Sequence, residues 1–210
     1  MTPLTGQALI NQLLEVLAFF NREFPEDHPY ESISPSPHPS LRPDLFMRLQ
    51  RRRHANRFPA RTWVCLAGQI NPSIATPVLK KYRENFRPSQ YLSKPYSILS
   101  TIIVVCAETD EEARYLARPA ELQWARWGTG QIHHPPPTLD EAQTHTYTAG
   151  EDAARREAKG RFVIGTPARV KAERQQLATE AQIDELMTVN MITDHQAQLK
   201  SYRLPPKPLI

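Results

Sequence analysis

Glycine is scarce in this sequence, with seven residues among 210, whereas proline occurs 20 times. Average proteins contain roughly 7% glycine and 5% proline, so the usual ratio is inverted. A glycine-rich loop that surrounds phosphates is therefore not expected, and neither G-x-G-x-x-G nor G-x-S-x-G occurs. These absences argue against a Rossmann nucleotide site and against a hydrolase with a Ser-His-Asp triad.

Cysteine and long apolar runs are also rare. Cys65 and Cys106 stand alone, without the paired spacing of a zinc site or a disulfide framework. No apolar stretch approaches the ~20 residues that a membrane span needs, and the first residues lack the pattern of a secretion signal. We therefore expect a cytoplasmic protein with reduced core cysteines and no membrane contact.

Positive charge is concentrated in one segment. The net formal charge is +4, yet Arg48–Arg61 contains six arginines and no acidic residue, so the rest of the chain is slightly acidic. Such a run can bind nucleic acid through phosphate contacts. Few aromatic residues lie between these arginines, and no known recognition motif surrounds them. We therefore favour a solvated segment and keep nucleic-acid binding as the alternative.

Helices and strands alternate along the second half of the chain. The apolar, β-branched run 97–107 predicts a strand buried on both faces, and 184–192 predicts a second one. Shorter strands are expected at 45–47 and 62–66. Helices are predicted at 7–23, 74–86, 110–127, 138–146, 148–160, 167–181 and 193–202. This order predicts an α/β protein with parallel βα units, and four strands allow only half of a (β/α)₈ barrel.

Five segments in register resemble one protein family, the bacterial-luciferase-like flavin-dependent monooxygenases. They are 82–89, 107–113, 163–167, 184–187 and 191–195. The helix before 24–30 is also similar to the segment that precedes the fifth barrel strand of that family. The resemblance implies a partial (β/α)₈ TIM barrel, of which this chain has the C-terminal half with a helical insertion. It also implies reduced FMN or coenzyme F420 as cofactor, with O₂ acting on an organic substrate.

The same resemblance divides the chain into four parts. Residues 1–24 are the helix before the fifth strand, 25–67 a proline-rich connector and aberrant Arg-rich segment, 68–204 the C-terminal barrel portion, and 205–210 a tail. The family's first four strands would be missing, and with them most flavin contacts. The segment 48–67 departs from the family pattern, and we hypothesise that it is translated out of frame.

These departures lead us to expect a truncated oxidoreductase that does not catalyse alone. A half barrel exposes strand edges, so we expect a homodimer or a complex with a full-length homologue, which is also the alternative function. A flavin reductase would be a further partner if the chain were active.

Candidate site residues lie within and directly after the predicted strand 184–192. Asp194 and His195 are at the strand end where barrel active sites form, and the imidazole titrates near neutrality. We nevertheless favour a helix N-cap followed by a surface histidine. Asn190 is polar within an apolar strand, and it either points into a flavin pocket or satisfies neighbouring backbone.

Other conspicuous side chains have ordinary explanations. His133 and His134 are adjacent and have no carboxylate at ligand spacing, so no metal site is predicted. Trp124 and Trp127 favour helix packing over base stacking. Arg126 and Arg161 could bind an anionic group, although arginines beside helix ends are common.

Overall fold

The computed structural model describes residues 6–34, 46–48, 64–67, 71–88 and 92–205. The strands are β1 (Phe46–Arg48), β2 (Val64–Ala67), β3 (Ser97–Cys106), β4 (Phe162–Gly165) and β5 (Glu185–Val189). The helices are α1 (Gly6–Asn21), α2 (Pro72–Asn85), α3 (Asp110–Gly128), α4 (Leu139–Thr144), α5 (Ala149–Ala158), α6 (Pro167–Ala181) and α7 (His195–Arg203). A 3₁₀ turn, Lys159–Arg161, joins α5 to β4.

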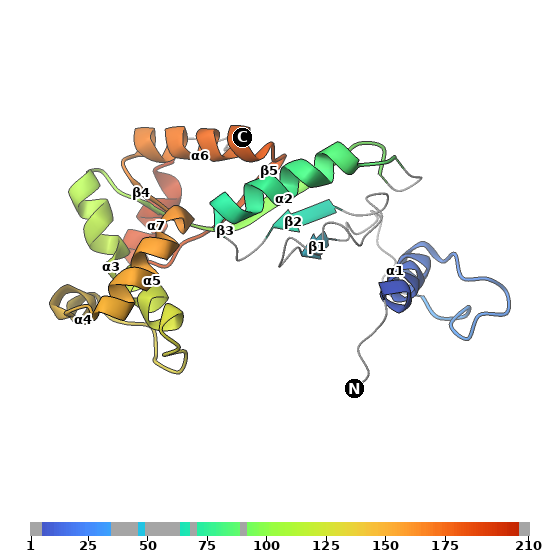
Figure 1. Cartoon of the computed structure of the whole chain (residues 1–210), viewed down its shortest axis with the longest axis horizontal. Helices are drawn as coiled ribbons and strands as arrows, with labels where there is room; N and C mark the ends of the chain where they lie inside the picture. The colour runs from blue at the N-terminus through green and yellow to red at the C-terminus, as the bar shows by residue number, and fades with distance from the viewer. Residues whose placement is uncertain (1–5, 35–45, 49–63, 68–70, 89–91, 206–210) are drawn as a thin grey trace.

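The described strands form one parallel sheet of five strands with β3 at its centre (Figure 1). The first residues of β3 pair with β2, and its last residues pair with β4. The strand β5 also pairs with β3, from Ile98 opposite Glu185 to Ile103 opposite Val189. Parallel neighbours need crossover connections, which α2 supplies between β2 and β3 and α3–α5 supply between β3 and β4, while α6 leads from β4 to β5. The expected α/β architecture and partial barrel are confirmed.

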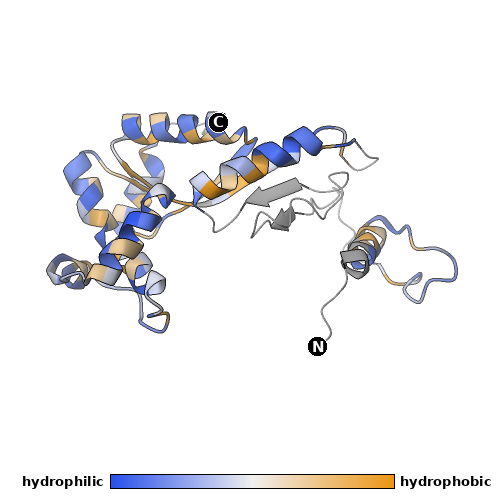
Figure 2. Cartoon of the chain, in the orientation of Figure 1, coloured by the Kyte–Doolittle hydropathy of each residue, from blue (hydrophilic) through white to orange (hydrophobic). Residues whose placement is uncertain are grey.

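Apolar cores lie on both faces of β3. Leu99, Val104 and Cys106 pack with side chains of α2 and α6, whereas Ile103 and Val105 pack with α3. In Figure 1, α2 and α6 accordingly lie on one side of the sheet, and α3 and α5 on the other. The ribbon of β3 is orange in Figure 2, whereas the helices around it carry both blue and orange residues. Burying each of these side chains contributes about 1.5–3 kcal/mol, so β3 organises both layers.

Most predicted elements occur within a few residues of their expected positions. The strand predicted at 97–107 is β3, and every residue of it whose burial is described is buried. The strands predicted at 45–47 and 62–66 correspond to β1 and β2. The prediction missed β4, because four residues after Lys159-Gly160-Arg161 form a strand only by pairing with the distant end of β3.

The prediction that 184–192 is a strand buried on both faces is wrong. The strand β5 ends at Val189, and its burial alternates. Leu186 is buried, whereas Met187 and Val189 are 48% and 38% exposed. Among the described strands β5 pairs only with β3, and only its Leu186 face packs against the core shared with α2 and α6.

The N-terminal part contributes less to this core. Leu14 lies on the predicted apolar stripe of α1 but is 44% exposed, while Leu17 and Phe20 are half-buried. Residues 25–34 contain turns and neither helix nor strand. Most of the proline-rich and Arg-rich region, 35–45 and 49–63, lies outside the described residues, so the domain boundaries remain a prediction. No helix in the described part of the chain has both the length and the apolar character that crossing a membrane requires.

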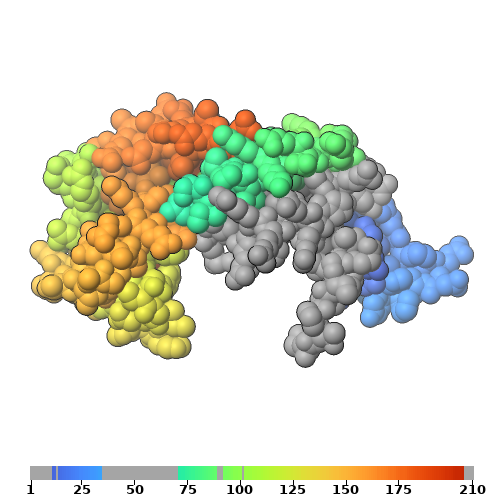
Figure 3. Space-filling view, in the orientation of Figure 1, coloured from blue at the N-terminus to red at the C-terminus, as the bar shows by residue number. Residues whose placement is uncertain are grey.

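The helices α3, α4 and α5 form a lobe beside the sheet. Figure 3 shows it in yellow and orange, projecting beyond the layer of α2 and α6. Its buried anchor is Glu151, only 3% exposed, whose carboxylate accepts hydrogen bonds from the Thr148 backbone N–H and the Gln131 amide. His145 Nε2 lies 3.1 Å from Glu151 Oε2. The Thr148 backbone bond is the largest cause that lowers the pKa of Glu151 to about 2.

We expect Glu151→Gln to destabilise the protein by about 2 kcal/mol at neutral pH. Because the pKa of Glu151 is lower in the folded chain, its contribution is complete above its ordinary pKa of 4.5 and is lost as the pH falls toward 2. Chemical unfolding at several pH values measures this effect. The exposed neighbour variant Glu157→Gln is the control, and a pH-independent difference between wild type and Glu151→Gln would contradict the assignment.

Candidate functional site

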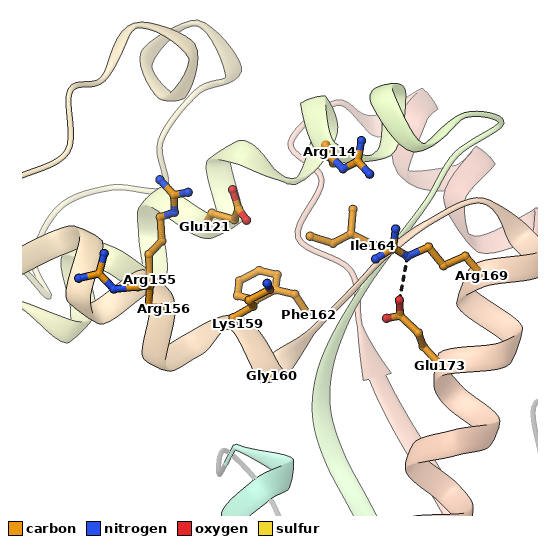
Figure 4. Close-up of a pocket in the computed structure, with 10 residues that line it drawn as sticks. All are labelled: Arg114, Glu121, Arg155, Arg156, Lys159, Gly160, Phe162, Ile164, Arg169 and Glu173. Atoms are coloured by element: carbon orange, nitrogen blue, oxygen red, sulfur yellow. Dashed lines mark hydrogen bonds and ion pairs between the residues drawn. The ribbon is translucent and has the colours of Figure 1, made fainter.

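An open pocket of about 770 Å³ lies where α3, α5, β4 and α6 meet (Figure 4). Phe162 and Ile164, on one face of β4, form its apolar floor. The helix α3 starts shortly after β3, and α6 starts directly after β4, so Arg114 and Arg169 lie near the carboxyl ends of parallel strands, whereas Arg155, Arg156 and Lys159 precede β4. Ligands bind preferentially at such ends in α/β proteins. The lining residues are Arg114, Glu121, Arg155, Arg156, Lys159, Gly160, Phe162, Ile164, Arg169 and Glu173.

One carboxylate joins the starts of α3 and α6. Asp110 Oδ1 accepts a hydrogen bond from the Thr166 backbone N–H at 3.2 Å, and Oδ2 lies 3.3 Å from Arg169 Nη1. Gly165 permits this approach with a φ of +155°. A Cβ atom there would lie 2.6 Å from Arg169 Cδ and 2.8 Å from Asp110 Oδ1. The junction therefore holds Arg169 at the pocket wall.

The lining is strongly basic, with five cationic side chains against two carboxylates. Three of the cations have neighbours that fix them. Arg169 Nε donates to Glu173 at 2.8 Å, which raises the pKa of Arg169. Arg114 lies 3.6 Å from Asp110, and Arg155 lies over the Tyr147 ring at 4.3 Å. These contacts orient the guanidinium groups around the pocket, and their carboxylate partners offset part of the positive charge.

Two cations remain without an ion pair among the described residues. Arg156 and Lys159 are exposed, and Figure 4 shows both on the α5 side of the pocket. Burial raises the pKa of Glu121, which Arg155 counteracts. Because cations outnumber carboxylates in the lining, the arrangement can bind an anionic ligand whose apolar part rests on Phe162.

The structure places the three predicted site residues away from this pocket. Asp194 caps α7 by accepting from the Ala197 backbone N–H at 2.7 Å, and His195 follows it on the surface. Asn190 is buried, donating to Ser201 Oγ and accepting from the Ile192 backbone N–H. These geometries match the favoured N-cap arrangement and the backbone-satisfying alternative. A direct role in binding remains a prediction for all three.

The remaining sequence candidates are also explained by packing. Trp124 and Trp127 make an edge-on contact with ring centroids 5.2 Å apart. Arg126 is buried in an ion pair with Glu141, and Arg161 lies over the Trp124 ring at 4.5 Å. His133 and His134 are exposed, and the described residues contain no group of side chains that could hold a metal ion.

The sequence interpretation missed the basic residues of the pocket. Arg155, Arg156 and Lys159 are close in sequence, and their density before the short strand β4 is a signal that could have drawn attention to them. Arg114 and Arg169 carry no such signal. They reach the site because α3 and α6 start from adjacent strands, which periodicity alone does not reveal.

An open parallel sheet with helical crossovers defines the class of this protein as part of a (β/α)₈ barrel. No family model matches the chain. It is 35% identical over 192 residues to the uncharacterized protein YceB of Bacillus subtilis, across 91% of this chain and 57% of that protein. It is 31% identical over 141 residues to a luciferase-like monooxygenase of Escherichia coli, across 66% of this chain and 41% of that protein.

Solved structures agree with these relatives. The crystal structure of apo-MsnO8 matches with a TM-score of 0.75 and 26% identity, over 95% of this chain and 59% of that one. A Pseudomonas putida diketocamphane monooxygenase component in complex with FMN shares the fold at 16% identity, with a TM-score of 0.54, over 96% of this chain and 63% of that one. The coenzyme F420-dependent tetrahydromethanopterin reductase of Methanopyrus kandleri also shares the fold, at 11% identity. Its TM-score is 0.52, over 92% of this chain and 60% of that one.

The chain belongs to the bacterial luciferase-like monooxygenase family. It spans between about two fifths and three fifths of the length of the curated relatives described above. Among the solved structures described above, the diketocamphane monooxygenase component is in complex with FMN and the Methanopyrus kandleri reductase depends on coenzyme F420.

We expect Gly165→Ala to destabilise the protein by about 1–3 kcal/mol, because the new methyl group would force Arg169 and Asp110 apart. Thermal unfolding measures the loss. Gly150→Ala is a matched control, since its Cβ would lie 3.5 Å from the nearest atom, in ordinary contact within α5. Equal stability of the two variants would show that the junction tolerates a side chain.

Proposed function

We propose that this chain forms the C-terminal part of a flavin-dependent monooxygenase barrel and binds a phosphate-bearing flavin in its basic pocket. The observation that carries the proposal is the gathering of five cations, from α3, α5, the turn before β4 and α6, around the apolar floor formed by β4. Its volume, about 770 Å³, is within the ~300–1,000 Å³ typical of small-ligand sites. Bound reduced FMN or coenzyme F420 would supply the reducing electrons, delivered by a flavin reductase.

The residues of the pocket fit such a ligand. Arg156 and Lys159 are the cations available for a phosphate, since Arg114, Arg155 and Arg169 already have neighbours. A guanidinium binds two phosphate oxygens at once, whereas an ammonium acts as a point charge. Phe162 and Ile164 would contact the apolar ring system and exclude water from it.

We propose further that the chain does not oxygenate a substrate alone. A closed barrel has eight strands, whereas the described sheet has five. One of these, β4, has only four residues and pairs with the last residues of β3. Part of the enclosure that protects a reactive flavin from water would have to come from elsewhere. Family membership supports the type of chemistry, and the partial coverage of the relatives supports this restriction.

Titration of the whole chain with FMN and with riboflavin tests the binding proposal. We expect FMN to bind more tightly, with an affinity that falls as salt is added, because riboflavin lacks the phosphate. The double variant Arg156→Ala, Lys159→Ala should weaken FMN binding by about tenfold, since about 1.4 kcal/mol is lost with the phosphate contacts. Flavin fluorescence quenching measures both affinities.

Lys171→Ala removes an exposed lysine of α6 that does not line the pocket, and it should bind FMN like the wild type. Equal affinities for FMN and riboflavin, or an unchanged double variant, would contradict the proposed site.

A second candidate function is association with another chain through β5. Beyond β3, no described strand pairs with β5, and its open face presents Met187 and Val189. An unpaired strand edge beside exposed apolar side chains favours addition of a further strand. We propose that a second copy of this chain pairs there, with a full-length homologue as the other possible occupant.

Sedimentation of the purified chain tests this association. We expect a dimer for the wild type and a monomer for Met187→Lys, because a lysine on the edge strand opposes pairing. Ile132→Lys changes another exposed apolar residue and should remain dimeric. A monomeric wild type would contradict pairing between copies, and capture of a full-length homologue by that monomer would identify the other occupant.

A further inference from the structure

Arg174 is a buried cation without a partner. It occupies the inward face of α6 together with Val170, Ala178 and Ala181, and only 2% of it is exposed. Its Nε and Nη2 atoms are buried and form no hydrogen bond in the described part of the chain. An uncompensated charge in an apolar core is costly, and a guanidinium does not escape the cost by losing its proton.

A small cavity lies beside this arginine, between α6, β5 and α7. Its volume is about 60 Å³, and its polar lining consists of Arg174, Thr188, Asn190, Ser201 and Tyr202. No carboxylate lines it. The nearby thiol of Cys106 does not supply a negative charge, because burial raises its pKa. The positive charge of Arg174 therefore has no internal counter-ion among these residues.

The polar groups around the cavity offer donors more than acceptors. Ser201 Oγ already accepts from the Cys106 backbone N–H and from Asn190 Nδ2, both at 2.9 Å. Asn190 Oδ1 is engaged by the Ile192 backbone N–H. The hydroxyl hydrogens of Ser201 and Thr188 thus remain available, as do the unpaired N–H groups of Arg174.

We infer that this cavity binds one small monovalent inorganic anion, of the size of chloride. A site built from a guanidinium and hydroxyl donors is selective for negative charge. The cavity, at about 60 Å³, is far smaller than the basic pocket and has room for an ion of this size beside Arg174. The anion neutralises Arg174 and ties α6 to β5 and α7. This site is separate from the basic pocket and does not depend on flavin binding.

Thermal unfolding of the whole chain in sodium chloride and in sodium gluconate, at equal ionic strength, tests the inference. Gluconate serves as the large organic reference anion. We expect chloride to raise the unfolding midpoint by about 3 °C with saturating dependence on concentration, because an anion that binds only the folded state stabilises it. Bromide should act like chloride. Equal midpoints in chloride and gluconate would overturn the proposal.

Arg174→Met should abolish the difference between the two salts, whereas Lys171→Met, on the exposed side of the same helix, should keep it. Retention of the chloride effect in Arg174→Met would also overturn the site. Thr188→Val offers a second variant if Arg174→Met does not fold, and it should reduce the chloride shift. Broadening of the chloride magnetic resonance line by the wild-type protein, reversed by bromide, measures binding without unfolding.

Discussion

Burial of β3 on both faces is the constraint on which the rest of the structure depends. A ten-residue strand with apolar side chains on both sides must be covered by two layers, and its backbone groups must be paired along both edges. The neighbours β2, β4 and β5 satisfy those groups, all in parallel register. Parallel pairing then requires helical crossovers, α2 before β3 and α3–α5 after it, and it brings the carboxyl ends of the strands to one edge of the sheet.

The basic pocket follows from that geometry. The helices α3 and α6 begin after adjacent strand ends, and Asp110 ties their first turns together through Thr166 and Arg169. The capping interaction at α3 is part of the same arrangement. Thr109 Oγ1 accepts from the Glu112 backbone N–H, and the Glu112 carboxylate accepts from the Glu108 backbone N–H. The chain thus fixes these helix ends with polar contacts while leaving cations at the pocket rim.

The chain belongs to the luciferase-like family but spans only part of the length of its relatives, and the packing of the described residues reflects both facts. The βα units at the centre are well packed, whereas the open face of β5 leaves Met187 and Val189 exposed. Arg174 is a second irregularity, because an apolar residue would suit the inward face of α6 better. The unpaired edge of β5 and the buried charge of Arg174 both indicate that a ligand or another chain stabilises the described residues.

The sequence by itself determined the α/β class, the buried strand β3, most helix boundaries and the family resemblance, because periodicity, capping residues and short motifs are local properties of the chain. It also favoured the N-cap arrangement of Asp194 and His195, which the structure contains. Only the tertiary structure decided that β5 has one open face, that Phe162–Gly165 is a strand, and that Arg114, Arg155, Arg156, Lys159 and Arg169 surround one pocket. Those features depend on which distant segments become neighbours, and a local pattern does not contain that information.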